Sequence, residues 1–449
     1  MIKKIVILLL PILLLSCGTD LFYSSFYIRN SDFQWMLSPS EQNNLNYKST
    51  PVGTGDFRFN SPSIIGTSDN YILFFYERRN NDANTAIIGI DGSTANKADV
   101  YVAISKNAET FSVQKIGNSS LDSHGSPISF VNKNSDVVVL AVSGNGFGSA
   151  ASDVPSRISK IVSVAKSEYK IWNEWEDLET NIFEPLLKED YNRFYTSPDS
   201  GITLRNGTLA CIIDYKKKTD NNAIGFAILY STDNGTNWKI GAKTTYQNHR
   251  FAKIIAERND GKLLIAAVEN SNNDYNKKAK LVWFLADSLE GNITSFTANG
   301  LPLHNCGSTA SGKIKVAEGG YSKQALLLLH SYPERATTNQ NNIANTVNNV
   351  NSLYISFDEG QNWNMVTNIF YPLTEGEYNG QKIYFYDEYD NMASFRQSMR
   401  VLKDGTIATV SENGGYVINT SGADVGFKLV YRRFSLNAIS GGKYRYEGL

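Results

Sequence analysis

Cysteine is scarce in this sequence, and neither sign of charge is in excess. Three cysteines among 449 residues cannot form the framework of a disulfide-stapled scaffold, so a large apolar core must stabilise the fold. The 43 basic and 44 acidic residues nearly cancel, which removes the main argument for a nucleic-acid partner. Metal-ligand spacing is missing among the four histidines, and neither a phosphate loop nor a nucleophile elbow is present. The sequence therefore predicts no metal and no cofactor.

The sequence has one long apolar run near its start, and that run is too short for a membrane span. Ile5–Leu15 follows a basic start, whereas a helix needs about 20 apolar residues to cross a bilayer. This pattern is typical of an export signal, here residues 1–16. Leu14-Leu15-Ser16-Cys17 resembles a bacterial lipobox, in which Cys17 is lipid-modified. The alternative is an ordinary cleaved signal with a chance cysteine.

The next segment, residues 17–51, is polar and has no sustained periodicity. We interpret it as a tether between the lipid anchor and the following domain. An acylated Cys17 would hold the protein at the bacterial cell surface or at the periplasmic face and leave everything downstream in water.

Residues 52–449 are predicted to form one domain built from a repeat. Six times, a turn signal precedes an apolar strand, and a second apolar strand follows. The continuous apolar runs imply sheets that are buried on both faces. Repeated small sheets predict an all-β fold, a six-bladed β-propeller of four-stranded antiparallel sheets. The strand pairs are 72–76 and 100–105, 137–142 and 161–167, 209–213 and 226–231, 263–268 and 281–286, 325–330 and 353–356, and 407–410 and 427–434.

A turn motif follows two of the second strands. Ser231–Trp238 and Ser356–Trp363 both read S-x-D-x-G-x-x-W, and weaker copies occur at Ser105–Phe111 and Ala165–Trp172. The aspartate can accept backbone N–H bonds, the glycine allows the reversal, and the tryptophan fills space between sheets. This motif is the Asp-box, and with it the sequence resembles the bacterial sialidase family, whose fold is a six-bladed propeller.

Four further segments extend the resemblance over roughly residues 52–440. They are Tyr76-Glu77-Arg78-Arg79, Ser197–Leu209, Leu402–Ile407 followed by Glu412, and the closing strand Phe427–Leu436. The resemblance implies an exo-α-sialidase, a glycoside hydrolase that releases terminal sialic acid from extracellular glycoconjugates. It also implies sialylated glycans or glycoproteins as partners; we expect a monomer that meets the membrane only through its lipid anchor.

The family's site chemistry implies which residue types to seek. Three arginines hold the sialic acid carboxylate, because guanidinium groups match carboxylate oxygens. A tyrosine activated by glutamate is the nucleophile, and an aspartate is the acid and base. This sequence departs from the family at several of these positions: Asn60 stands for the first arginine, Ala252 for the glutamate, Val268 for the second arginine and Arg396 for the nucleophile.

Nearby side chains could replace the missing ones. Arg58 lies two residues before Asn60, and Arg250 lies two residues before Ala252, so each arginine is on the same strand face as the position that it could replace. Arg58, Arg250 and Arg396 are each expected at the start of an innermost strand. Those three arginines are the candidate carboxylate ligands. Three further positions agree with the family and would flank the substrate, or alternatively brace the axis as an ion-pair network: Glu77, Arg79 and Glu412.

The catalytic candidates lie in two loops. Tyr386 or Tyr389 would be the nucleophile, the alternative being that each is a packing or sugar-stacking residue. Asp82 or Asp91 would be the acid and base. The altered positions leave a second function open. The chain could be a catalytically inactive sialidase-like propeller that binds glycans or host proteins as a surface lipoprotein.

Overall fold

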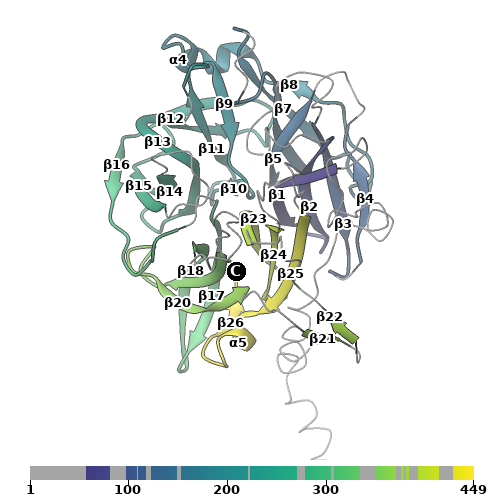
Figure 1. The fold of residues 1–449 in the computed structure, drawn as a ribbon, viewed down its shortest axis with the longest axis vertical. Coiled ribbons are helices and arrows are strands. Elements are labelled where there is room, and N and C mark those ends of the chain that lie inside the picture. The colour runs from purple at the N-terminus through teal and green to yellow at the C-terminus, as the bar shows by residue number, and fades with distance from the viewer. Residues whose placement is uncertain are drawn as a thin grey trace, which may run out of the picture.

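The computed structural model describes residues 57–80, 98–108, 110–117, 123–148, 153–220, 223–269, 279–304, 308–333, 349–370, 376–378, 381–383, 393–413 and 428–449. The proposed signal and tether, Cys17 included, lie outside these ranges. The fold of the described part is all-β, with several four-stranded antiparallel sheets. Figure 1 shows the sheets standing around a common centre, with β1 (Phe57–Gly66), β10 (Ile202–Thr203) and β23 (Ala393–Val401) near that centre.

Most strands pair with their neighbours in chain order. The first contains β1, β2 (Ile72–Asn80), β3 (Ala98–Ser105) and β4 (Ser112–Lys115); the next contains β5 (His124–Val131), β6 (Val137–Gly144), β7 (Ser156–Val162) and β8 (Glu176–Asp177). One eight-stranded sheet contains the long strand β13 (Lys239–Glu257). The first half of β13 pairs with β12 (Ala223–Ser231) and its second half with β14 (Leu263–Glu269). The other strands of this sheet are β9 (Arg193–Thr196), β10, β11 (Leu209–Lys216), β15 (Lys280–Ala286) and β16 (Ile293–Phe296).

The remaining sheets come from the last part of the chain. One contains β17 (Ala310–Glu318), β18 (Tyr321–Pro333), β19 (Asn349–Ser356), β20 (Asn364–Phe370) and β26 (Arg445–Gly448); the other contains β23, β24 (Thr406–Asn413) and β25 (Lys428–Ser435). A separate hairpin joins β21 (Gly376–Tyr378) to β22 (Gln381–Ile383). The described helices have four residues each: η1 (Thr180–Phe183), α4 (Glu184–Leu187) and α5 (Leu436–Ile439). In these ranges, no helix has the length and apolar character that a membrane crossing requires.

Most of the predicted strands are confirmed, with one displacement. The strand predicted over 161–167 is β7, which ends at Val162. Its C-terminal part turns instead, because Lys166, Glu168 and Tyr169 have positive φ angles that a strand does not tolerate. The pattern misled because the apolar residues Val162 and Val164 continue the strand's alternation into that turn.

The two Asp-box turns form as predicted. In the first, the Asp233 carboxylate accepts the backbone N–H of Asn237 at 2.9 Å and the hydroxyl of Ser231 at 2.8 Å. Asp358 repeats the backbone bond with Asn362 at 2.8 Å. The tryptophans Trp238 and Trp363 are buried between sheets. Local side-chain to backbone bonds of this kind stabilise a turn independently of the rest of the chain.

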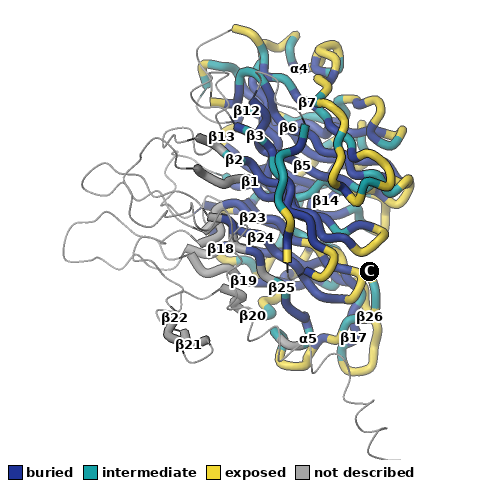
Figure 2. The backbone as a smooth tube through the Cα atoms, turned by 90° about the vertical axis from the view of Figure 1, so that its right-hand side faces the viewer, coloured by how far each residue is buried: buried dark blue, intermediate teal, exposed yellow. Residues whose placement is uncertain are grey.

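The apolar core consists of clusters that each lie between two neighbouring sheets. Proceeding along the chain, one cluster joins each described sheet to the next. A further cluster returns to the beginning, because Val410 of β24 and Phe74 of β2 share it. Cys211 is a buried thiol of this core, and burial raises its pKa. Figure 2 shows the buried strands in the middle of the molecule and exposed residues on its turns.

One buried carboxylate connects the inner strands at the centre. Asp199 lies between β9 and β10, and its Oδ1 accepts the Ser398 hydroxyl at 2.5 Å and the Met399 N–H at 3.2 Å, both from β23. Its Oδ2 is paired with Lys253 of β13 and accepts the Ser311 N–H of β17 at 3.3 Å. The carboxylate therefore connects three inner strands, β13, β17 and β23, to the segment between β9 and β10.

The backbone of Asp199 adds a fourth connection and carries strain. Its N–H donates to the Pro62 carbonyl of β1 at 3.1 Å. Its φ of 102° lies in a region that disfavours any side chain, at a cost of about 1–3 kcal/mol. Such a conformation persists only where the surrounding contacts fix it.

Replacing the central carboxylate should therefore destabilise the whole domain. Asp199→Asn leaves Lys253 buried without its counter-ion, so we expect a loss of about 3–5 kcal/mol in the free energy of unfolding. Denaturant unfolding measures it, with Asp233→Asn in an Asp-box turn as the matched control at about 1 kcal/mol. Equal losses in the two variants would contradict the central role of Asp199.

Candidate functional site

The candidate site lies at the end of the molecule where the inner strands begin, called here the entry end. Equivalent positions of neighbouring inner strands meet: Ser63 of β1 bonds Ser129 of β5 at 2.6 Å, and Ser398 of β23 accepts the Ile64 N–H at 2.8 Å. These strands therefore run side by side in one direction. The residues before these contacts, and the ends of the second strands that pair with them, gather at the entry end.

In the first sheet, the sequence candidates share one face. Arg58 is opposite Arg79, and Asn60 is opposite Glu77, so these four positions alternate onto the same side of β1 and β2. The structure describes the backbone of Arg58 and Arg79 but not their side chains. Glu77 is fully buried, and its Oε2 accepts the Ser126 N–H of β5 at 2.8 Å. Glu77 therefore also joins the first sheet to the second.

Arg250 lies in a cluster of buried cations. It belongs to the middle of the continuous strand β13, opposite Val268, and not to the start of a strand as predicted. Its charge acts on Lys216 of β11, as does that of Arg193, which is opposite Lys216 in β9. Burial lowers the pKa of Lys216 to about 8; the Asp220 carboxylate opposes this change, and the two arginines add to it. We call Arg193, Lys216 and Arg250 the cationic cluster.

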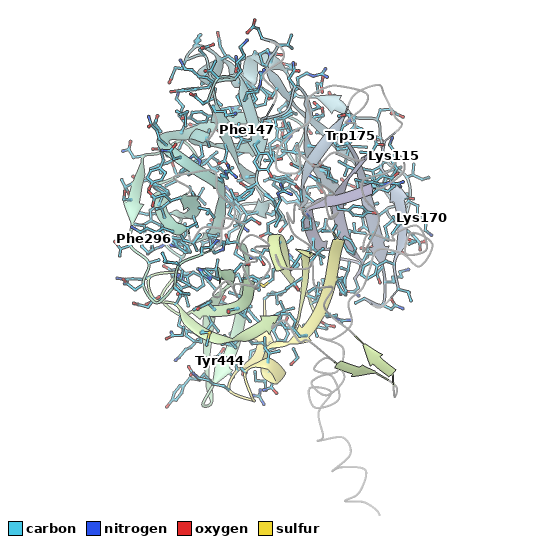
Figure 3. The ribbon with its side chains drawn as sticks, in the orientation of Figure 1. Lys115, Phe147, Lys170, Trp175, Phe296 and Tyr444 are labelled. Atoms are coloured by element: carbon cyan, nitrogen blue, oxygen red, sulfur yellow. The ribbon has the colours of Figure 1, made fainter. Side chains whose placement is uncertain are left out.

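An aromatic ring and a buried histidine–aspartate pair lie beside the cationic cluster. The Lys216 ammonium lies 4.8 Å from the centre of the Phe147 ring, which Figure 3 labels in the upper half of the molecule. The neighbour of Arg250, His249, has its Nε2 3.1 Å from an oxygen of Asp214, and both side chains are buried. This entry-end segment of β13 is thus held from two sides.

Arg396 lies on another inner strand. It is fully buried in β23, within the irregular stretch between Ala393 and Gln397. Its neighbour Gln397 donates from Nε2 to the carbonyls of Ser308 at 2.9 Å and Leu329 at 3.0 Å. β17 contacts both β13 and β23, so it lies between the strands that carry Arg250 and Arg396. Glu412 is opposite Leu429 in the same sheet, and its side chain is not described.

Two of the positions at which this sequence differs from the sialidase site residues hold apolar core residues. Ala252 and Val268 are buried, so neither can offer a polar group to a substrate. The other candidates, Asp82, Asp91, Tyr386 and Tyr389, lie outside the described residues, and their assignment stays a prediction. Within the described ranges, no group of three or more His, Cys, Asp or Glu side chains could hold a metal ion.

Sequence reasoning missed the partners of Arg250. Arg193 begins β9 and Lys216 ends β11, but their approach to β13 depends on pairing between distant segments. The spacing of a buried Asp214 and His249, 35 residues apart, likewise carries no local signal.

Two further histidines form a buried pair, His330 in β18 and His304 in the segment before β17. The rings of His304 and His330 meet edge to face with centres 4.6 Å apart, and Tyr354 contacts His330 from the other side. Burial, and then the charge of His304, keep the pKa of His330 well below its ordinary value. His330 is therefore neutral in the folded protein.

The fold and the Asp-box turns are the features that the comparisons with known proteins also detect. Residues 61–274 match the family model of the BNR repeat-like domain. Among curated proteins, no sequence matches.

Solved structures extend the similarity beyond that segment. The Hadza microbial sialidase Hz136 aligns with a TM-score of 0.56 and 16% identity over 85% of this chain and 66% of its own. The Trypanosoma rangeli sialidase in complex with sialic acid gives 0.58 and 14%, over 86% and 55%. NanB sialidase from Streptococcus pneumoniae gives 0.56 and 12%, over 90% and 73%. The chain thus has the sialidase fold and spans between half and three quarters of these relatives.

The buried histidine pair predicts a measurable pH dependence. An unfolded His330 takes up a proton below pH ~6.5, whereas the folded one does not, so folding stability falls as the pH falls below that value. His330→Phe removes this difference and should flatten the stability curve by up to ~1.4 kcal/mol per pH unit between pH 6.5 and 5. Denaturant unfolding at several pH values tests it; parallel curves for the two proteins would contradict a neutral His330.

Proposed function

We propose that this protein is an exo-α-sialidase that removes terminal sialic acid from extracellular glycoconjugates. The observation that carries the proposal is the burial of Arg250 and Arg396 at the entry end of inner strands in a sialidase fold. Buried guanidinium groups bind a carboxylate more strongly than exposed ones, because water competes less for both partners.

The proposed architecture is a closed six-bladed propeller. Every described sheet shares an apolar cluster with the next, and Val410 with Phe74 supports closure between the last sheet and the first. The eight-stranded sheet would divide at the middle of β13 into the third and fourth blades. A closed ring suits the function because it points all inner strands at one axial site.

The proposed mechanism follows the resemblance. Arg58, Arg250 and Arg396 would hold the carboxylate of sialic acid, with Glu77, Arg79 and Glu412 beside them. The hydroxyl oxygen of Tyr386 or Tyr389 would attack the anomeric carbon as the glycosidic bond breaks, and its proton would pass to a carboxylate base, for which Glu388 is the neighbour in the sequence. Asp82 or Asp91 would protonate the leaving oxygen and then take a proton from the water that releases the sugar from the tyrosine. The cationic cluster would keep Arg250 in an electropositive environment that favours an anionic sugar.

A specific observation supports a second candidate function. The apolar Ala252 and Val268 occupy positions where the family has a glutamate and an arginine, which favours a propeller that binds sialylated glycans without cleaving them. An assay of hydrolysis together with binding separates the two functions, since a binding protein retains affinity but releases no product.

Hydrolysis of a fluorogenic sialoside tests the first proposal. We expect measurable release by the intact protein, and Arg250→Ala should reduce kcat/KM by about 10- to 100-fold, the value of one charge-assisted contact. Arg445→Ala, an exposed arginine of β26, is the matched control and should change nothing. No release at high enzyme concentration would exclude the hydrolase, and binding of the uncleaved sialoside would then support the second function.

The lipid anchor is a separate proposal with its own test. Cys17→Ser should move the protein from the membrane fraction to the soluble fraction when it is expressed in a bacterium that processes lipoproteins. Retention of the variant on the membrane would exclude Cys17 as the anchor.

A further inference from the structure

A cavity of about 490 Å³ lies at the opposite end of the molecule from the candidate site. Its walls come from turns that follow β1, β3 and β23, so it spans the first and last sheets. Its volume is within the usual range of about 300–1,000 Å³ for small-molecule sites. Nothing in the proposed function uses this cavity.

The described lining is strongly positive. Four cations, Lys106, Arg400, Lys403 and Arg433, stand against one side-chain carboxylate, Asp404. The terminal residue Leu449 also lines the cavity, and its α-carboxylate leaves a local excess of two positive charges, whereas the whole chain has a net charge of −1. A concave surface lined by one sign of charge concentrates ions of the other sign.

Three of the four cations have partners in the protein. The Lys106 ammonium lies 4.7 Å from the centre of the Tyr71 ring and 3.4 Å from Glu168. Arg433 is paired with Asp404, and Lys403 donates to the Ser68 carbonyl. Lys106 and Arg433 each have a carboxylate partner, whereas the partner of Lys403 is an uncharged carbonyl. The positive charge of Lys403 therefore stays available to a ligand.

Arg400 has no such partner. Within the part of the chain that the structure describes, no hydrogen bond or ion pair reaches its guanidinium, and its side chain is exposed to the cavity. Surrounding protein nevertheless lowers its pKa, with a smaller opposing effect from Asp199. The place of Arg400 in the cavity wall leaves its guanidinium accessible to a ligand. Asp199 cannot neutralise Arg400 fully, because its oxygens are already bound to Lys253 and Ser398.

We propose that this cavity binds an acidic sugar, through a carboxylate or a sulfate ester held by Arg400 and Lys403. A desolvated cation without a counter-ion is unfavourable, and a bound anion removes that cost. Asn70 and Asn107 also line the cavity, and side-chain amides both donate to and accept from sugar hydroxyls. The cations select the acidic group, and the amides favour a sugar over a bare ion.

Isothermal titration of the full chain tests the site with defined probes. Glucuronic acid and N-acetylglucosamine 6-sulfate represent the two acidic groups, and glucose and inorganic sulfate are the comparison ligands. We expect at least one acidic sugar to bind at least tenfold more tightly than either comparison ligand. Arg400→Met should weaken that binding at least tenfold, because it keeps the side chain's bulk and removes its charge.

Two variants guard against a folding defect. Lys403→Met removes an exposed charge in the same cavity and should also weaken binding, and Lys188→Met removes an exposed charge on α4 and should not. Which acidic sugar binds decides between a carboxylate and a sulfate ester as the ligand group. Binding that is equal for inorganic sulfate, unchanged in both cavity variants, or absent for both acidic sugars would overturn the proposal.

Discussion

The Asp199 carboxylate is the interaction on which the arrangement of the inner strands depends. It binds groups from β13, β17 and β23 while its own N–H reaches β1, so it fixes four strands at one height. Arg250 stands three residues before Lys253, and Arg396 two residues before Ser398. The contacts that hold the centre therefore also set the positions of both buried arginines at the entry end, so central stability and the proposed carboxylate site share the same strands.

The two ends of the propeller are built by different physics. The end with the Asp-box turns is stabilised locally, since each turn contains its own hydrogen bonds and a buried tryptophan. The entry end is stabilised by contacts between sheets, such as Glu77 with the Ser126 N–H and Asp214 with His249. A change at the entry end is therefore felt by neighbouring sheets, whereas Asp-box turns can degenerate one at a time, as the copy at Ser105–Phe111 has.

This division explains what could be predicted from the sequence. Strands and Asp-box turns follow from local patterns. The predicted strands lie within a few residues of the observed ends, except for β7, where Val164 continued an apolar alternation into a turn. The role of Asp199 was not foreseen, since Lys253 and Ser398 lie 54 and 199 residues away. The cationic cluster was missed for the same reason. The continuity of β13 was missed because two half-strands with different partners look like two strands in a sequence.

The central claim is that Arg250 and Arg396 converge on one carboxylate at the entry end. A crystal structure of this protein with DANA, the inhibitor bound by the Trypanosoma rangeli relative, tests it most directly. The account predicts an inhibitor on the axis with its carboxylate within about 3.2 Å of both guanidinium groups. An inhibitor that binds elsewhere, or one whose carboxylate contacts neither arginine, would contradict it.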